Sequence, residues 1–212
     1  MFVTRCDVQA AGNTAMPFDV LSHEFTKQIK SCGAILVIAT PFYGPLVVQR
    51  AWCLFEAVIA WICGVPIVVL LPRSEEAALL RRIQEKGGDE ILIKVMTAID
   101  SSKAKATVAE DLENILRVIE SKVSGGFPEV DGIYKRVIRT WVMDMLKKLE
   151  ATFAEGSLEA ARFANQCGII MYGVGDYDKA IEFYERGLAI KIKVLGEEHT
   201  EVATSYNNLG IV

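Results

Sequence analysis

Residues 158–196 read LEAARFANQCGIIMYGVGDYDKAIEFYERGLAIKIKVLG, and residues 197–212 read EEHTEVATSYNNLGIV. The first stretch has the pattern of a helix, a glycine-containing turn and a second helix, and the second stretch begins the same unit again. Asn165 and Asn207 lie 42 residues apart, and a glycine follows each of them by three residues. A fixed period of small residues in helix pairs is typical of a helical solenoid. The sequence therefore predicts all-α helical hairpins over residues 157–212.

This part of the chain resembles a tetratricopeptide (TPR) repeat array of the kinesin light chain and nephrocystin type. The resemblance rests on Gly168, GDYDKAIEFYERGLAI at 175–190, LGEEHTEVA at 195–203 and SYNNLG at 205–210. It implies that Gly168 and Ala180 are small so that paired helices approach closely. It also implies that Tyr184 and Leu188 fill the groove between those helices.

TPR arrays bind extended peptides on a concave face that is lined by the first helix of each repeat. Asn165 and Asn207 fall on that helix at the same repeat position. A carboxamide offers one acceptor and two donors, so it can pair with a peptide backbone whatever the side chains are. Arg162 and Tyr172 are expected on the same face. We expect these four residues to bind the partner; the alternative for each is an ordinary solvated helix position.

The sequence before residue 127 has a different pattern, in which apolar runs alternate with amphipathic segments. This order favours an α/β fold, with a parallel sheet flanked by helices on both faces. GAILVIA, residues 33–39, is a continuous apolar run that suits a strand covered on both faces. The predicted strands are 1–8, 33–39, 65–71 and 90–99, and the predicted helices are 18–31, 45–62, 74–86, 106–123 and 128–150.

The N-terminal part resembles a TIR-like domain. Such domains read as a strand, Ser/Thr-Pro-x-Tyr/Phe, a helix with W-C-x-x-E-L, and an apolar strand. The matching stretches are AILVIATPFY at 34–43, WCLFEAVIA at 52–60 and VPIVVLL at 65–71. The motif positions are occupied by Thr40, Pro41, Tyr43, Trp52, Cys53 and Glu56.

Glu56 is the only acidic residue of the apolar stretch RAWCLFEAVIAW, residues 50–61. In TIR-type NAD hydrolases the glutamate of this helix is similar in position to the catalytic one, which stabilises charge on the ribose as nicotinamide leaves. Many TIR adaptors carry the same motif and only assemble. In those proteins the carboxylate is structural, because a buried carboxylate needs hydrogen-bonding or basic partners to remain charged. Both interpretations stay open, and we commit to no catalytic residue.

Composition narrows the class of protein. The chain has 212 residues, is 51% hydrophobic and 24% charged, and carries a formal net charge of −4. It can therefore bury a core. Its net negative charge argues against a generic nucleic-acid or anionic-membrane binder, since both need a basic surface, so we expect neither partner. Residues 51–71 are the one candidate membrane span, but Gly64 and Pro66 interrupt it, so a helix, a turn and a buried strand explain it better.

The cysteines and histidines indicate neither a disulfide framework nor a metal site. Five cysteines are an odd number, no two of them have C-x-x-C spacing, and the chain has only two histidines. This usage fits a reducing compartment, and we expect a cytoplasmic protein without a metal or a cofactor.

We thus expect a TIR-like α/β domain over 1–126 that lacks its first strand, a connecting helix within 127–156 and TPR repeats over 157–212. The sequence reads as a fragment of a longer protein. The expected function is that of an adaptor: the TPR array binds an extended peptide, and the TIR-like module serves recruitment or self-association. The alternative is a TIR-type NAD hydrolase that is regulated by its TPR array, with NAD as the substrate.

Overall fold

A computed structural model of the chain describes residues 17–42, 46–84, 88–97 and 99–212. These residues are mostly helical and divide into two compact units. Unit 1 holds the described residues of 1–38, 46–70 and 100–134, and unit 2 holds those of 39–45, 71–99 and 135–212. The predicted strand 1–8 and the motif residue Tyr43 lie outside the described residues.

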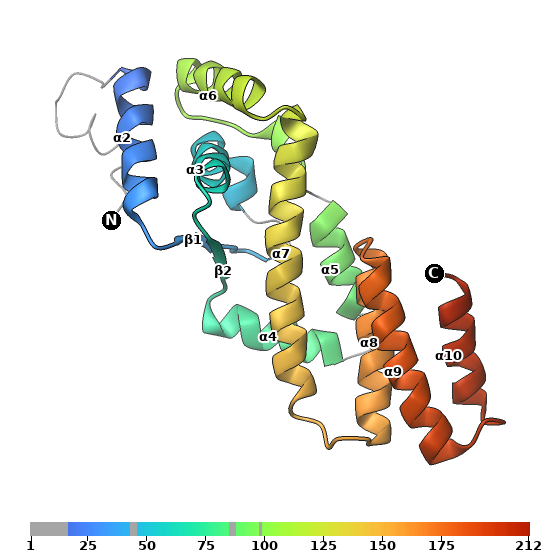
Figure 1. The fold of residues 1–212 in the computed structure, drawn as a ribbon. Coiled ribbons are helices and arrows are strands. Elements are labelled where there is room, and N and C mark those ends of the chain that lie inside the picture. The colour runs from blue at the N-terminus through green and yellow to red at the C-terminus, as the bar shows by residue number, and fades with distance from the viewer. Residues whose placement is uncertain (1–16, 43–45, 85–87, 98) are drawn as a thin grey trace. The chain divides into compact units, whose positions relative to one another are not determined.

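Unit 1 is an α/β unit with a small sheet. Its α-helices and strands, labelled in Figure 1, are α2 (Phe18–Ser31), β1 (Ile35–Ile38), α3 (Ala51–Ile62), β2 (Ile67–Leu70), α6 (Ala109–Lys122) and the first part of α7 (Gly126–Glu150). It also contains the short 3-10 helices η1 (Leu46–Gln49) and η2 (Ser101–Lys103).

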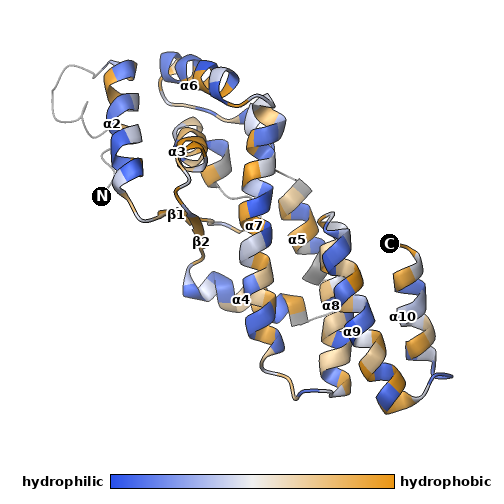
Figure 2. Cartoon of the chain, viewed as in Figure 1, coloured by the Kyte–Doolittle hydropathy of each residue, from blue (hydrophilic) through white to orange (hydrophobic). Residues whose placement is uncertain are grey.

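The core of unit 1 gathers around α3, which is apolar along most of its length (Figure 2). Phe25 of α2 stacks on Trp52, with 5.4 Å between the ring centroids. The indole N–H of Trp52 donates to the buried Asp111 carboxylate of α6 at 3.3 Å. These contacts fasten α2 and α6 to α3, because aromatic rings contribute large buried areas and a buried indole N–H needs an acceptor.

The two strands of unit 1 pair in parallel, as the sequence predicts. The register runs from Ile35 opposite Ile67 to Ile38 opposite Leu70. The prediction that both faces of this sheet are covered was wrong for the described residues. Side chains on one face are buried, whereas those on the other face are 40–59% exposed. The buried set is Ile35, Val37 and Val69, and the exposed set is Leu36, Ile38, Val68 and Leu70.

The predicted helix 45–62 is two helices, η1 and α3. Arg50 between them has an extended backbone and forms a parallel bridge with Lys105. The N–H of Ala51 donates to the Lys105 carbonyl at 2.9 Å, and the Lys105 N–H donates to Gln49 at 2.8 Å. Long-range backbone pairing therefore ends the helical pattern, which local periodicity cannot reveal.

The stretch 51–71 is a helix, a turn and a strand, as expected. Helix α3 ends at Ile62, Gly64 adopts a positive φ of 67°, and β2 begins at Ile67. A positive φ favours glycine because other residues would place Cβ against the backbone. No helix in the described ranges is both long enough and apolar enough to cross a membrane.

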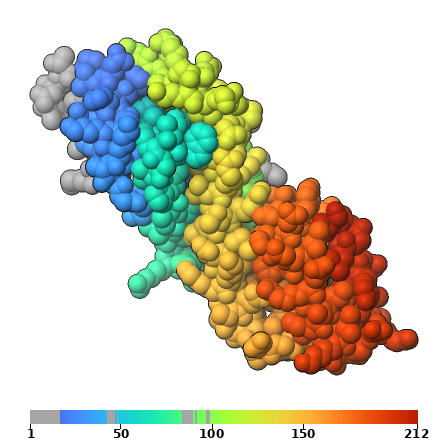
Figure 3. Space-filling model, viewed as in Figure 1, coloured from blue at the N-terminus to red at the C-terminus, as the bar shows by residue number. Residues whose placement is uncertain are grey.

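Unit 2 is helical throughout its described elements. They are α4 (Arg73–Gln84), α5 (Gly88–Thr97), the rest of α7, α8 (Leu158–Gly173), α9 (Tyr177–Leu195) and α10 (Thr200–Gly210). In the space-filling view, the side chains of residues 157–212 form one continuous body (Figure 3).

The predicted strand 90–99 was wrong, because this segment forms helix α5. Leu92, Val95 and Met96 are all buried, and Ile99 just beyond the helix is buried too. Their spacing of three, four and seven residues is that of one helix face. The β-branched residues of EILIKVMTAI hid this pattern.

The expected domain boundaries stay a prediction, but the compact units divide the chain differently. Residues 71–99, which we expected within the α/β domain, group with 135–212 in unit 2. The expected connecting helix, α7, begins at Gly126 and ends at Glu150, close to the predicted 128–150.

Candidate partner-binding site

Helices α8, α9 and α10 each begin at a residue whose side chain caps the helix. The Ser157 hydroxyl accepts a hydrogen bond from the Ala160 N–H at 3.1 Å. Asp176 accepts from the Lys179 N–H at 3.4 Å, and His199 Nδ1 accepts from the Glu201 N–H at 3.1 Å. Such caps satisfy backbone donors that have no partner inside the helix.

Helices α8 and α9 approach closely where the sequence predicts small residues. A Cβ at Gly168 would overlap the ring of Tyr184, whose side chain is only 1% exposed. Ala180 is fully buried as well, and Leu188 is 9% exposed. Gly187 is a further small position, since a Cβ there would lie 2.9 Å from the Ala161 carbonyl oxygen. These contacts fit the roles that the TPR resemblance implies for Gly168, Ala180, Tyr184 and Leu188.

Two polar contacts join α8 to α10. The Arg162 guanidinium donates to both carboxylate oxygens of Glu201, at 3.1 and 2.6 Å. One turn further along α8, the side-chain oxygen Oδ1 of Asn165 accepts from the side-chain amide of Asn208 at 2.8 Å. Two of the four expected binding residues, Arg162 and Asn165, therefore also hold the helices of successive repeats together.

The other two expected binding residues are exposed. Asn207 is an exposed residue of α10. Tyr172, near the end of α8, is 38% exposed, and its ring lies 5.6 Å from that of Tyr177. The structure thus places Arg162, Asn165 and Asn207 on neighbouring helices, with Tyr172 at the other end of α8. That these four residues bind a partner stays a prediction.

Sequence reasoning missed the amide that follows each repeated asparagine. Gln166 and Asn208 are also 42 residues apart. The Asn208 amide donates to Asn165, and the Gln166 amide donates to the Ile83 carbonyl of α4. In both cases the amide reaches an element that precedes its own helix in the chain. The pairs NQ at 165–166 and NN at 207–208 carry this signal in the sequence.

A buried lysine also belongs to the α8–α10 junction. Lys191 of α9 is 3% exposed, and its ammonium donates to the Ser205 hydroxyl at 3.0 Å. It lies 3.9 Å from the Glu201 carboxylate. Burial lowers the pKa of Lys191, and Glu201 opposes that effect. The hydrogen bonds from Arg162 hold the pKa of Glu201 below its ordinary value, so this carboxylate stays charged between two cations.

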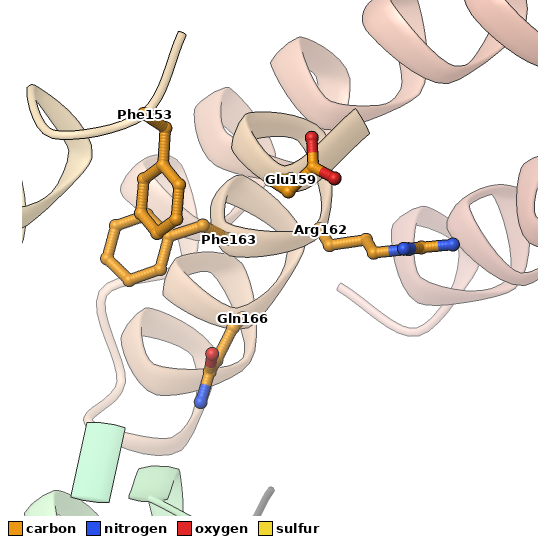
Figure 4. A pocket seen from close by; sticks show the side chains of 5 residues that line it. All are labelled: Phe153, Glu159, Arg162, Phe163 and Gln166. Carbon is orange, nitrogen blue, oxygen red and sulfur yellow. The ribbon is translucent and has the colours of Figure 1, made fainter. Parts of the chain in front are cut away.

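A pocket of about 310 Å³ opens at the start of α8 (Figure 4). Its apolar wall is the pair Phe153 and Phe163, with ring centroids 5.1 Å apart. Glu159, Arg162 and Gln166 complete the lining. The Arg162 side chain extends away from the two rings, as its pairing with Glu201 requires (Figure 4). Nothing in the sequence pattern singled out Phe153, because it lies before the repeat.

The structure places Glu56 in unit 1, on the half-buried side of α3. Burial raises its pKa from 4.5 to about 7, against a smaller opposing effect of Arg50. It makes no hydrogen bond with any described residue. One turn earlier, the Cys53 carbonyl accepts from the buried Tyr134 hydroxyl at 3.0 Å. Among the residues that the structure describes, Glu56 is therefore a carboxyl group in an apolar setting without a hydrogen-bonding partner.

The other TIR-motif residues fall in both units. The Thr40 hydroxyl and the Phe42 N–H both donate to the Glu75 carboxylate of α4, the second at 3.1 Å. These residues belong to unit 2, whereas Trp52, Cys53 and Glu56 belong to unit 1. Within the described ranges, no three His, Cys, Asp or Glu side chains gather as a metal site would require. The described cysteines are free thiols, and burial strongly raises the pKa of Cys167.

Comparison with known proteins bears on the last quarter of the chain. The family model described as "Tetratricopeptide repeat" matches residues 159–212, which comprise α8, α9 and α10. Comparisons with curated proteins and with solved structures gave no match. The TPR repeat is thereby confirmed, and it indicates a role in protein–protein interaction. No comparison supports the kinesin light chain type or the TIR-like resemblance.

Proposed function

We propose that this protein is an adaptor whose TPR repeat binds an extended peptide of a partner protein. The observation that carries this proposal is the family match over residues 159–212 together with the exposed polar residues of α8 and α10. A solenoid presents the first helices of its repeats side by side, and their outward side chains form an extended binding surface.

Asn207 and Tyr172 are the residues best suited to contact that peptide. Both are exposed, whereas the side-chain oxygen of Asn165 already accepts a hydrogen bond from Asn208. The carboxamide of Asn207 can pair with a peptide backbone, and Tyr172 offers an aromatic surface with a hydroxyl group.

The test is an array of unrelated peptides probed with the full chain, followed by variants against any peptide that binds. Asn207→Ala should weaken binding about 2- to 12-fold, the effect of one neutral hydrogen bond. Asn208→Ala is the matched control for stability, because its amide bonds to Asn165 and not to the peptide. A chain that binds no peptide, or an Asn207→Ala variant that binds as tightly as the parent, would contradict the proposal.

The TIR-like module would serve recruitment or self-association in the cytoplasm. Its own candidate activity is NAD hydrolysis, and one observation favours it. Glu56 has its pKa raised to about 7 by burial, and strongly perturbed carboxyl groups are common at catalytic sites. The test is NAD cleavage by the full chain. If the parent chain cleaves NAD and Glu56→Gln abolishes the cleavage without changing the melting temperature, the protein is an enzyme. If neither the parent nor the variant cleaves NAD, only the adaptor function remains as the proposal.

A further inference from the structure

A pocket lies at the start of α8, and the 42-residue period relates α8 to α10. A shift of 42 residues places Glu159 on Glu201 and Gln166 on Asn208. Both amides donate to an element that lies earlier in the chain, Gln166 to the backbone carbonyl of Ile83 and Asn208 to the side chain of Asn165. The two carboxylates can therefore be compared directly.

The carboxylates of Glu159 and Glu201 differ in the hydrogen bonds that they accept. Glu201 receives two hydrogen bonds from the guanidinium of Arg162, which lies on the preceding helix α8. Glu159 is exposed and accepts no hydrogen bond from any described residue, although its charge helps to raise the pKa of Arg162 on the next turn of α8. Because Glu159 lines the pocket, its carboxylate is available to a cation that enters there.

The wall of the pocket also suits a planar cation. Phe153 is half-buried and its ring is tilted by 33° against that of Phe163, which is only 4% exposed. The apolar surface that a guest can reach is therefore mainly that of Phe153, held in place by Phe163. A guanidinium is attracted to the face of an aromatic ring within about 6 Å of its centroid. Unit 2 already contains such an arrangement: Arg186 lies 4.8 Å from the ring centroid of Phe183 and 2.5 Å from the Glu150 carboxylate.

The charges around the pocket favour a cation. The one cationic side chain of the lining, Arg162, is neutralised by Glu201 and turned away from the rings (Figure 4). Glu155, two residues after Phe153, adds a second exposed carboxylate to the loop that leads into α8. A guest carboxylate would have to compete with Glu201 for Arg162, whereas a guest cation meets Glu159 without displacing any described contact.

We propose that the pocket formed by Phe153, Glu159, Arg162, Phe163 and Gln166 binds an arginine side chain of the partner. The guanidinium would donate to the Glu159 carboxylate, and the methylene stem would lie along the accessible ring of Phe153. Arginine fits better than lysine, because its planar fork pairs with both oxygens of a carboxylate and stacks on aromatic rings. This inference rests on the proposed function, since the arginine would belong to the bound peptide.

The direct test titrates the full chain with N-acetyl-arginine methylamide and follows the backbone amide resonances of Phe163 and Gln166 by NMR. Saturable shifts with a Kd of the order of millimolar are expected, which is a realistic affinity for a single side chain. The citrulline derivative has nearly the same shape without the charge, and it should bind at least about 10-fold more weakly. Equal shifts with citrulline or with the leucine derivative would overturn the arginine assignment, as would the absence of shifts with the arginine derivative.

Variants distinguish arginine binding in this pocket from the proposed peptide binding by the TPR repeat. Glu159→Gln should weaken binding of the arginine derivative about 3- to 10-fold, whereas the matched loop variant Glu155→Gln should change it less than about 2-fold. Equal effects of the two variants would mean that only general charge attraction is at work, and would overturn the site. If array peptides bind while the arginine derivative does not shift Phe163, the pocket proposal fails and peptide binding stands. If the derivative binds and no peptide does, the proposed function fails and the pocket stands.

Discussion

Two carboxylates, Glu56 in unit 1 and Glu201 in unit 2, have opposite surroundings. Burial in an apolar helix raises the pKa of Glu56 to about 7. Two hydrogen bonds from Arg162 lower the pKa of Glu201, with help from Lys191 and His199. The first carboxylate works against the folded state when it is charged, and the second supports it. The charges at the repeat junction are therefore part of the structure, whereas Glu56 is a titratable group that the fold merely tolerates.

The largest expected effect is at Glu56. Because its folded pKa lies above the unfolded value of 4.5, stability should fall as the pH rises from 4.5 to about 7, and the full penalty should apply above 7. The penalty is at most about 3 kcal/mol. Glu56→Gln should remove this pH dependence and stabilise unit 1 at pH 8, as measured by urea unfolding with tryptophan fluorescence at pH 5 and pH 8.

This expectation reverses the sign that a structural carboxylate would give, since loss of a buried charge-assisted hydrogen bond would destabilise. Glu120→Gln, at an exposed position of α6, is the control and should change stability by less than about 0.5 kcal/mol. A Glu56→Gln variant that is less stable than the parent at pH 8 would show that the carboxylate has a partner in solution.

The second effect breaks the close approach of α8 and α9. Gly168→Ala places a methyl group 2.4 Å from ring carbons of Tyr184, whose side chain is only 1% exposed, so something must shift. Overpacking of this kind costs about 1–3 kcal/mol. Thermal unfolding followed by circular dichroism should show the loss. Gly210→Ala occupies the same repeat position with nothing within 4 Å of the added carbon, and it should be nearly neutral.

The third effect is at Glu201. Glu201→Gln removes the acceptor of Arg162 and the negative charge that lies 3.9 Å from the buried ammonium of Lys191. We expect a loss of about 1–2 kcal/mol at pH 7, reduced by the exposure of the ion pair. Because the folded pKa of Glu201 is depressed, this contribution is present above pH 4.5 and is lost as the pH falls further. Glu198→Gln, in the exposed linker before α10, should leave the unfolding temperature unchanged.

The smallest effect distinguishes two neighbouring asparagines. Asn208→Ala should cost about 0.5–1.5 kcal/mol, because it removes the hydrogen bond to Asn165. Asn207→Ala should leave the stability within about 0.5 kcal/mol of the parent, because the residue is exposed. Urea unfolding of both variants gives the comparison. Equal losses would mean that the two asparagines have the same role, and would remove the reason for assigning Asn207 to the partner.

The repeat could be predicted from the sequence almost completely, because its signals are local and occur twice. The 42-residue period located α8, α9 and α10, and small residues located their contact. The α/β part was harder, since apolar runs alone do not distinguish a strand from a buried helix. GAILVIA became β1, whereas EILIKVMTAI became α5, and only the burial of Leu92, Val95 and Met96 shows why.

The candidate site was predictable in part. The expected residues Arg162 and Asn165 do lie beside α10, but their hydrogen bonds to Glu201 and Asn208 could not be foreseen from a single helix face. The pocket depends on Phe153, which comes from outside the repeat and has no periodic counterpart that would reveal its role.

The amides of Gln166 and Asn208 each bond to an element that lies earlier in the chain, Ile83 in one case and Asn165 in the other. A ribosome therefore releases each acceptor before its donor. For these two hydrogen bonds, each helix docks onto an acceptor that has already been made. We therefore expect α8 to acquire protection from hydrogen exchange before α10 on nascent chains arrested at successive lengths.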